Sequence, residues 1–137
     1  MDYNDLSSEL LDMIISCARL PFQKVPTEFS KGETGILYFL TENGGNLSPG
    51  ELCTLMGIGS GRTADALKTL EQKRLIERRS DEYDKRKVIV FITDNGKSLI
   101  EKRRNEAREK IAETLLLLGD DDAKEFMRIL SKINSFR

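Results

Sequence analysis

Histidine is missing from this sequence of 137 residues, and with it the side chain that proteins use most often as a general base and as a metal ligand. Nucleophile pairs of the Ser-His and Cys-His type are therefore excluded. The two cysteines, Cys17 and Cys53, lie far apart, so we expect neither a disulfide framework nor a metal site of the usual spacing. No carboxylate sits in a glycine-rich phosphate loop. We therefore expect no enzymatic activity, no metal and no cofactor.

Long apolar runs are missing as well. The four leucines Leu115–Leu118 fall far short of the roughly 20 residues that span a bilayer. The first residues, Met1–Asp5, have neither the basic start nor the cleavage site of a secretory signal. We expect a cytoplasmic protein with no membrane partner. The net charge of -1, with 39% apolar and 33% charged residues, is typical of an ordinary globular domain.

The first part of the chain predicts two helices. Apolar residues recur at helical spacing over residues 3–20, up to the proline that follows. Pro26 is expected to hold the next segment extended or turned. A second helix should begin at Ser30, because Ser30 and Glu33 have the spacing of a capping box, and it should end at a Gly-Gly pair.

A short helix and a longer one follow, separated by glycines. Ser48-Pro49-Gly50-Glu51 predicts a helix N-terminus, with a serine cap, proline at the first position and glutamate at the third. Gly57 ends this helix after about one and a half turns. The next helix should be capped by Gly59 or Ser60. It has one apolar face, made of Thr63, Ala66, Leu67 and Leu70.

The apolar period then changes from helical to alternating. Two short segments, residues 75–79 and 87–93, of which the second is rich in β-branched side chains, flank a polar segment, residues 80–86. This pattern predicts a β-hairpin with an exposed, charged tip.

A long helix is expected next, with its N-cap in Thr93-Asp94-Asn95-Gly96 and its end at Leu118. About 25 residues of helix are roughly 37 Å long, more than the width of a small domain. We therefore expect a second copy of the chain to cover its apolar stripe. Asp120 or Asp121 should cap a last helix, whose apolar residues should face inward: Ala123, Phe126, Met127, Leu130 and Ile133.

Helix, short helix, glycine-containing turn, helix and hairpin are the order of a winged helix-turn-helix. The expected fold class is mainly α with a small β-hairpin wing (α+β). Residues 62–87 contain nine basic and six acidic side chains, a net charge of +3 that suits phosphate binding. A solvated charged surface explains the same excess equally well. The helix that begins near Ser60 would present its outer face to a major groove: Ser60, Gly61, Arg62, Asp65, Lys68, Thr69 and Gln72.

Four short motifs, in this order, resemble those of the MarR family of bacterial and archaeal transcription regulators. Residues 47–53 are similar to the family's helix opening before the turn, and residues 70–78 to the exit of its recognition helix. Asp84-Lys85-Arg86 resembles its Asp-x-Arg wing, and Ile92-Thr93-Asp94-Asn95-Gly96 resembles the Leu-Thr-x-x-Gly that follows. The resemblance extends from about residue 29 to residue 133.

The resemblance implies one domain over residues 1–137, with a winged helix-turn-helix at 29–93 and dimerisation helices at 1–28 and 94–137. Such a homodimer reads a pseudo-palindromic operator in double-stranded DNA, and a small-molecule effector or an oxidant often loosens its grip. Asp84 would hold the wing's arginine in place. The implied DNA-binding residues are Ser60, Arg62, Asp65, Lys68 and Thr69 in the major groove, and Arg86 with Lys85 at the minor groove.

Two residues depart from the family's pattern. Arg74 stands where the family often has glycine, so a left-handed backbone there would cost roughly 1 kcal/mol. Asp65 places a carboxylate where a basic or neutral side chain is common. It can accept a hydrogen bond from cytosine N4, or it can pair with Arg62 and stay off the DNA.

Some relatives sense organic hydroperoxides through a cysteine in the first helix, which implies a redox-sensing role for Cys17. Its place on an apolar stripe favours a small core residue instead, and Cys53 is expected to serve packing. Aromatic residues can line an effector pocket, although at helical spacing they more often belong to a core: Phe22, Phe29, Tyr38 and Phe39.

The alternative hypothesis belongs to a different functional class: a winged-helix protein-interaction module that has the same scaffold but does not bind DNA. Salt separates the two hypotheses, because affinity that depends on phosphate contacts falls steeply as the salt concentration rises.

Overall fold

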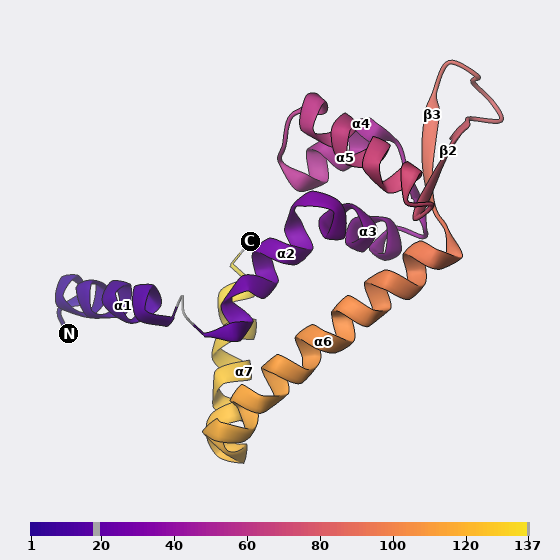
Figure 1. Cartoon of the computed structure of the whole chain (residues 1–137). Coiled ribbons are helices and arrows are strands. Elements are labelled where there is room, and N and C mark those ends of the chain that lie inside the picture. The colour runs from indigo at the N-terminus through magenta and orange to yellow at the C-terminus, as the bar shows by residue number, and fades with distance from the viewer. Residues whose placement is uncertain (18–19, 137) are drawn as a thin grey trace. The chain divides into compact units, whose positions relative to one another are not determined.

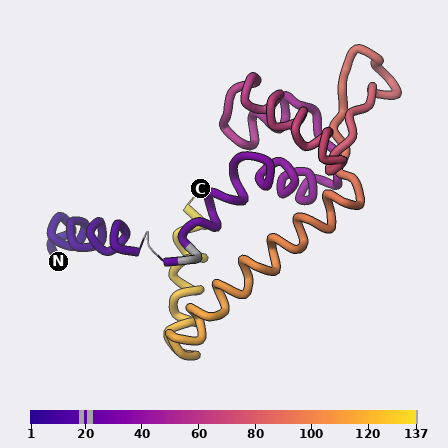
Figure 2. The backbone as a smooth tube through the Cα atoms, in the orientation of Figure 1, coloured from indigo at the N-terminus to yellow at the C-terminus, as the bar shows by residue number. Residues whose placement is uncertain are grey.

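The computed structural model describes residues 1–17 and 20–136 (Figure 1; Figure 2 traces the same backbone). Two compact units are present, Met1–Arg103 and Arg104–Arg137. The mainly helical chain with a small antiparallel sheet confirms the expected fold class. Its elements are α1 (Tyr3–Cys17), η1 (Pro21–Lys24), α2 (Val25–Ser30), α3 (Gly32–Glu42), β1 (Asn46–Leu47), α4 (Pro49–Met56), α5 (Ser60–Gln72), β2 (Ile76–Ser80), β3 (Val88–Ile92), α6 (Asp94–Leu118) and α7 (Asp120–Asn134).

The core of the first unit lies between α3, α4, α5 and the sheet. It is made of aliphatic side chains at the helical and alternating spacings of these elements, so that burial follows the sequence pattern. The residues with at most 1% of their surface exposed are Ile36, Leu37, Leu40, Leu52, Thr63, Leu67, Leu70, Ile76 and Val90. This core holds α5 by one face and leaves its other face in solvent.

The two helices of the predicted helix-turn-helix begin where the sequence predicts, and α4 ends at Gly57 as predicted, although its eight residues exceed the expected turn and a half. At the start of α4, the Glu51 N–H donates to the Ser48 hydroxyl (3.1 Å) and the Ser48 N–H donates to the Glu51 carboxylate (3.2 Å). This capping box satisfies two backbone donors that the first helical turn would otherwise leave unpaired. Gly57 ends α4 with a left-handed backbone (φ 64°), and Gly59 is the N-cap of α5.

The sheet has three antiparallel strands in the order β1-β3-β2. Strands β2 and β3 form the predicted hairpin, with Ile76 opposite Ile92 and Ser80 opposite Val88. The third strand, β1, pairs Asn46 with Phe91 and was not predicted. Two residues are too short a segment to show a strand pattern in the sequence.

Three local predictions were wrong. Pro26 does not hold an extended segment but lies in the first turn of α2, where its missing N–H has no helical partner to lose. The capping box of Ser30 and Glu33 does not form. Ser30 ends α2 and its hydroxyl donates to the Thr27 carbonyl (3.4 Å), while Lys31 is the N-cap of α3. Gly119, rather than an aspartate, is the N-cap of α7.

Apolar side chains stay exposed on α1 and α7. None of the fifteen described residues of either helix is buried. The predicted first helix ended at residue 20; α1 ends at Cys17, and Ala18 and Arg19 of that prediction lie outside the described residues. The expected inward face of α7 is exposed in the single chain: Phe126, Met127, Leu130 and Ile133 are 45–57% accessible. An exposed apolar face of this size is unusual in a folded monomer.

Arg74 has a positive φ of 61°, as expected for a residue that stands in a glycine position. Among the described non-glycine residues, Arg74 alone has a positive φ. Its left-handed backbone connects the end of α5 to β2. The contact of its Cβ with the following carbonyl oxygen makes this conformation costly.

Replacing Arg74 with glycine should therefore stabilise the protein by about 1 kcal/mol, because glycine adopts the same φ without strain. Urea denaturation of the wild type and the variant measures this difference in the free energy of unfolding. Ala64→Gly, at an exposed position inside α5, is the matched control and should lose about 1 kcal/mol. Equal losses in both variants would show that the backbone at residue 74 is not strained.

Candidate nucleic-acid interface

One face of α5 is polar and exposed. Thr63, Leu67 and Leu70 point into the core and Ala66 packs against it, so the opposite face of α5 is turned outward. Four of the five predicted major-groove residues are exposed, namely Ser60, Arg62, Asp65 and Lys68. Thr69 is half-buried, and its hydroxyl donates to the Asp65 carbonyl (3.1 Å). The helix thus offers hydroxyl, guanidinium, carboxylate and ammonium groups on one surface, the donors and acceptors with which proteins read base edges.

Arg62 and Asp65 lie on this surface at a spacing of three residues. Such a spacing allows an ion pair on a helix. In the described part of the chain no ion pair joins them; the salt bridges of the first unit lie elsewhere. The Asp65 carboxylate is therefore available to an external hydrogen-bond donor.

The wing places a cation at its tip through a tight local network. The Arg86 Nε donates to Asp84 Oδ1 (3.1 Å), and the Arg86 backbone N–H donates to the same oxygen (3.1 Å). These bonds to the charged form hold the pKa of the Asp84 carboxyl below its usual range. Although paired, the Arg86 side chain is 90% exposed, and Lys85 is exposed beside it.

Backbone hydrogen bonds keep the turn of the wing closed. The Asp81 N–H donates to the Lys87 carbonyl (2.9 Å), the Lys87 N–H to the Asp84 carbonyl (2.9 Å), and the Tyr83 N–H to Asp81 Oδ1 (3.2 Å). Two of the tip's carboxylates are thus bound to the tip's own backbone amides. The cationic side chains remain directed to solvent.

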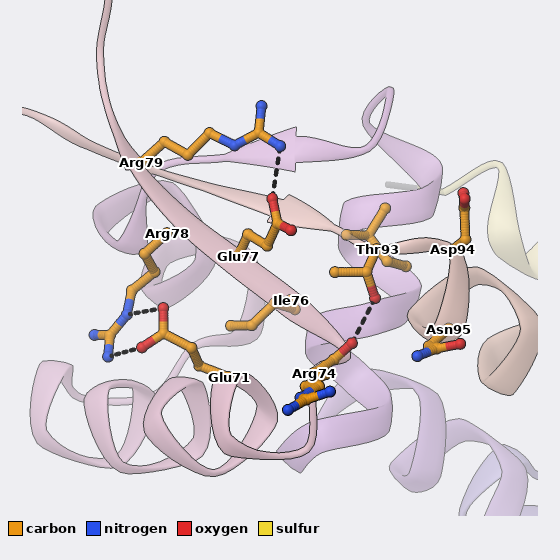
Figure 3. Close-up of a pocket in the computed structure, with 10 residues that line it drawn as sticks. Glu71, Arg74, Ile76, Glu77, Arg78, Arg79, Thr93, Asp94 and Asn95 are labelled. Atoms are coloured by element: carbon orange, nitrogen blue, oxygen red, sulfur yellow. Dashed lines mark hydrogen bonds and ion pairs between the residues drawn. The ribbon is translucent and has the colours of Figure 1, made fainter.

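An ion pair that the sequence did not predict joins α5 to the wing. Arg78 of β2 donates to both oxygens of Glu71, in the last turn of α5 (3.0 and 3.3 Å; Figure 3). The hydrogen bond lowers the pKa of Glu71 and raises that of Arg78. A hollow of about 720 Å³ lies beside this pair, lined by residues of α5, β2, the end of β3 and the start of α6. The partners lie seven positions apart, but α5 ends and β2 begins between them, so the helical spacing that the number suggests does not apply and the sequence pattern could not have predicted this contact.

The two cysteines are free and half-buried. The Cys53 thiol contacts the Thr63 hydroxyl (Sγ to Oγ1, 3.3 Å), a contact between α4 and α5 that agrees with a packing role. Three of the four aromatic residues pack on the core with edge-to-face geometry: Tyr38 lies 5.7 Å from Phe29 and 5.4 Å from Phe39 between ring centroids. The side chain of Phe22, the fourth, lies outside the described residues.

Within residues 1–17 and 20–136, no group of three or more carboxylate and cysteine side chains could hold a metal ion. No helix in the same residues is long and apolar enough to cross a bilayer.

An exposed polar helix held between a short helix and a β-hairpin defines a winged helix-turn-helix protein. Residues 29–87 match the sequence model of the MarR family. A MarR family protein from Bacillus stearothermophilus has the same fold, with a TM-score of 0.77 and 23% identity over 98% of this chain and 96% of that one. Residues 29–87 of this chain are thus similar to the MarR family, and the resemblance of its motifs is confirmed.

Two curated relatives are similar over this segment. The uncharacterized HTH-type transcriptional regulator YwaE of Bacillus subtilis is 32% identical over 65% of this chain and 52% of its own length. The HTH-type transcriptional regulator MgrA of Staphylococcus aureus is 31% identical over 61% of this chain and 55% of its own length. The chain therefore spans about half the length of these relatives. Both are named as transcriptional regulators, which agrees with the prediction that this chain is not an enzyme.

Proposed function

We propose that this chain is a sequence-specific, DNA-binding transcriptional regulator that acts in the cytoplasm. The observation that carries the proposal is the exposed polar face of α5 beside a wing whose tip presents Arg86 and Lys85, within a segment that is similar to the MarR family. A helix presented in this way fits the major groove, and a cationic hairpin beside it can reach the adjacent minor groove or its phosphates. In this proposal Ser60, Arg62, Asp65, Lys68 and Thr69 face base edges and nearby phosphates, and Asp84 positions Arg86.

The proposal includes a homodimer on a pseudo-palindromic operator. Its support is the apolar surface that each chain leaves in solvent: on α7 the side chains of Phe126, Met127, Leu130 and Ile133, and on α1 those of Leu10 and Ile14. Burying such faces against a second copy removes apolar area from water at about 25 cal/mol per Å². Residues 1–28 and 94–137 would form this interface, and residues 29–93 the DNA-reading part. Two-fold symmetry then requires two half-sites about one helical turn apart, roughly 10 bp between their centres.

Modulation by a small-molecule effector is part of the proposal because it is implied by the family. The aromatic cluster of Phe29, Tyr38 and Phe39 offers apolar ring surface for such a molecule, although all three rings also pack against the core. A redox role for Cys17 stands beside this, since its thiol is free and half-buried. Titration of DNA binding with oxidant and reductant, in the wild type and in Cys17→Ser, distinguishes redox control through Cys17 from control by a small-molecule effector.

A binding titration on the DNA upstream of the chain's own gene, at several salt concentrations, tests the proposed function. Each phosphate contact should add about -0.9 to the slope of log affinity against log salt concentration. A protein without affinity for any duplex at low salt would contradict the proposal. The family's scaffold would then serve as a protein-interaction module.

Arg86→Ala should weaken binding to every sequence and flatten this salt slope by about one unit per half-site. The reason is that Arg86 would neutralise a phosphate at each wing. Fluorescence anisotropy on operator and random duplexes measures both effects. Lys31→Ala, which removes an exposed cation outside α5 and the wing, is the matched control and should leave the slope unchanged. An unchanged slope in Arg86→Ala would remove the wing tip from the interface.

A further inference from the structure

The exit of α5 and the first turn of α6 are bound together through a single side chain, that of Thr93. Its hydroxyl donates to the Arg74 carbonyl, just after α5 (2.8 Å), and accepts the N–H of Gly96, in the first turn of α6 (3.1 Å; Figure 3 shows the bond to Arg74). The Thr93 backbone N–H donates to the Leu75 carbonyl (3.1 Å). Thr93 therefore caps α6 and cross-links it to the recognition helix at the same time.

This junction has no spare room. A Cβ added at Gly96 would lie 2.3 Å from the Leu75 carbonyl oxygen and 2.7 Å from Ile92 Cγ1. The backbone of α6 thus approaches Leu75, three residues beyond the end of α5, and only glycine permits the approach.

Two further contacts hold the end of α5 from other sides. Lys73 forms an ion pair with Glu33 of α3 (3.1 Å), and Glu71 is bound by Arg78. The left-handed backbone of Arg74 turns the carbonyl that Thr93 binds toward α6. The last residues of the recognition helix are therefore fixed to α3, β2 and α6, and the side-chain bond between Thr93 and the Arg74 carbonyl depends on one hydroxyl hydrogen.

We infer that Thr93 is a positioning residue for DNA recognition, which makes α5 and the first turn of α6 move as one body. The inference rests on the proposed function. Because α6 continues into residues 104–118, part of the proposed dimer interface, a fixed junction would set the half-site separation at which both recognition helices can bind. Losing the side-chain cross-link would loosen this junction and broaden the range of accepted separations, although the backbone bond between Thr93 and Leu75 would remain.

Three substitutions separate the two roles of the Thr93 hydroxyl, which caps α6 as an acceptor and binds the Arg74 carbonyl as a donor. Thr93→Ser keeps both the donor and the acceptor. Thr93→Asp keeps an acceptor that caps α6, since aspartate is a good N-cap, but its ionised side chain has no hydrogen to donate to the Arg74 carbonyl. Thr93→Val keeps the volume and the β-branch and loses both functions.

The experiment measures the affinity of the full chain for duplexes in which the half-site separation varies in single base pairs around the roughly 10 bp of one turn. The readout is the ratio between the affinity for the best separation and that for its neighbours. A uniform loss of affinity, such as the added charge of aspartate would cause, leaves this ratio unchanged. Circular dichroism confirms that each variant is folded at the temperature used.

We expect Thr93→Ser to keep the wild-type ratio, and both Thr93→Asp and Thr93→Val to lower it by about fivefold, the effect of losing one hydrogen bond. A ratio unchanged in Thr93→Asp, which retains the cap and hence the fold, would overturn the inference while leaving the proposed function intact. Wild-type protein with no affinity for any duplex would instead contradict the proposed function, and the inference with it.

Discussion

Leu130→Glu is expected to separate the proposed dimer into monomers and to lower operator affinity by about a hundredfold or more. Leu130 lies in the middle of the exposed apolar face of α7, between Met127 and Ile133, with about half of its surface accessible. A carboxylate at this position would have to be buried without a partner if a second copy covered the face. Two linked half-site interactions strengthen each other by a factor of 10² to 10⁴, and a monomer loses this gain.

Sedimentation velocity measures the oligomeric state, and anisotropy on the same samples measures DNA affinity. Lys132→Glu introduces the same carboxylate on the opposite side of α7, where it should leave the dimer intact. If Leu130→Glu remained dimeric with wild-type affinity, α7 would not contribute to the interface. If Lys132→Glu also dissociated, the effect would be one of net charge.

Gly96→Ala is expected to have the largest effect on stability. The added methyl group would overlap the Leu75 carbonyl oxygen, an atom of the backbone that cannot turn away as a side chain does. We expect a loss of about 3 kcal/mol in the free energy of unfolding, the upper end of what overpacking costs, and a melting temperature about 10 °C lower. Thermal and urea denaturation measure the two quantities.

Gly61→Ala is the control for this prediction. Gly61 lies in the first turn of α5, and a Cβ there would meet no atom within 4 Å. Alanine should therefore be neutral or stabilising by up to about 1 kcal/mol, since it has the higher helix propensity. In a chain of this size, 1 kcal/mol corresponds to a shift of roughly 3 °C in the melting temperature. If the melting temperature of Gly96→Ala lay within about 2 °C of that of Gly61→Ala, the close approach of α6 to residue 75 would be contradicted.

The elements that carry the proposed interface could be predicted from the sequence because their signals are local. Ser48 and Glu51 specify the start of α4 through contacts within one turn, and Gly57 specifies its end. Alternating apolar residues specify the hairpin, and the polar face of α5 follows from the burial of its apolar one. In each case the interacting residues are neighbours in the chain.

The same local reasoning failed where two signals competed. Ser30 and Glu33 have the spacing of a capping box, but residues 25–30 already form α2, so Ser30 is the last residue of that helix. Glu33 instead binds Lys73, forty residues later. Proline is likewise compatible both with an extended segment and with the first turn of a helix, and Pro26 lies in the first turn of α2.

The contacts that fix the candidate site were not predictable for a related reason. The pairs Glu71–Arg78 and Thr93–Arg74 are set by the packing of whole elements against each other, since the two partners of each pair lie in different elements or connections rather than on one helix or strand. The sequence did single out Thr93-Asp94-Asn95-Gly96 as a helix start and Arg74 as a replacement for glycine. It did not show that the two features touch.

The boundary between the two compact units falls inside α6, between Arg103 and Arg104, rather than in a loop. Trypsin cleaves after lysine and arginine and needs several residues of extended chain, which an intact helix does not provide. The run Lys102-Arg103-Arg104 is thus a protease site that opens only when α6 unwinds locally. The rate of cutting there would report how often the connection between the two units loses its helical structure.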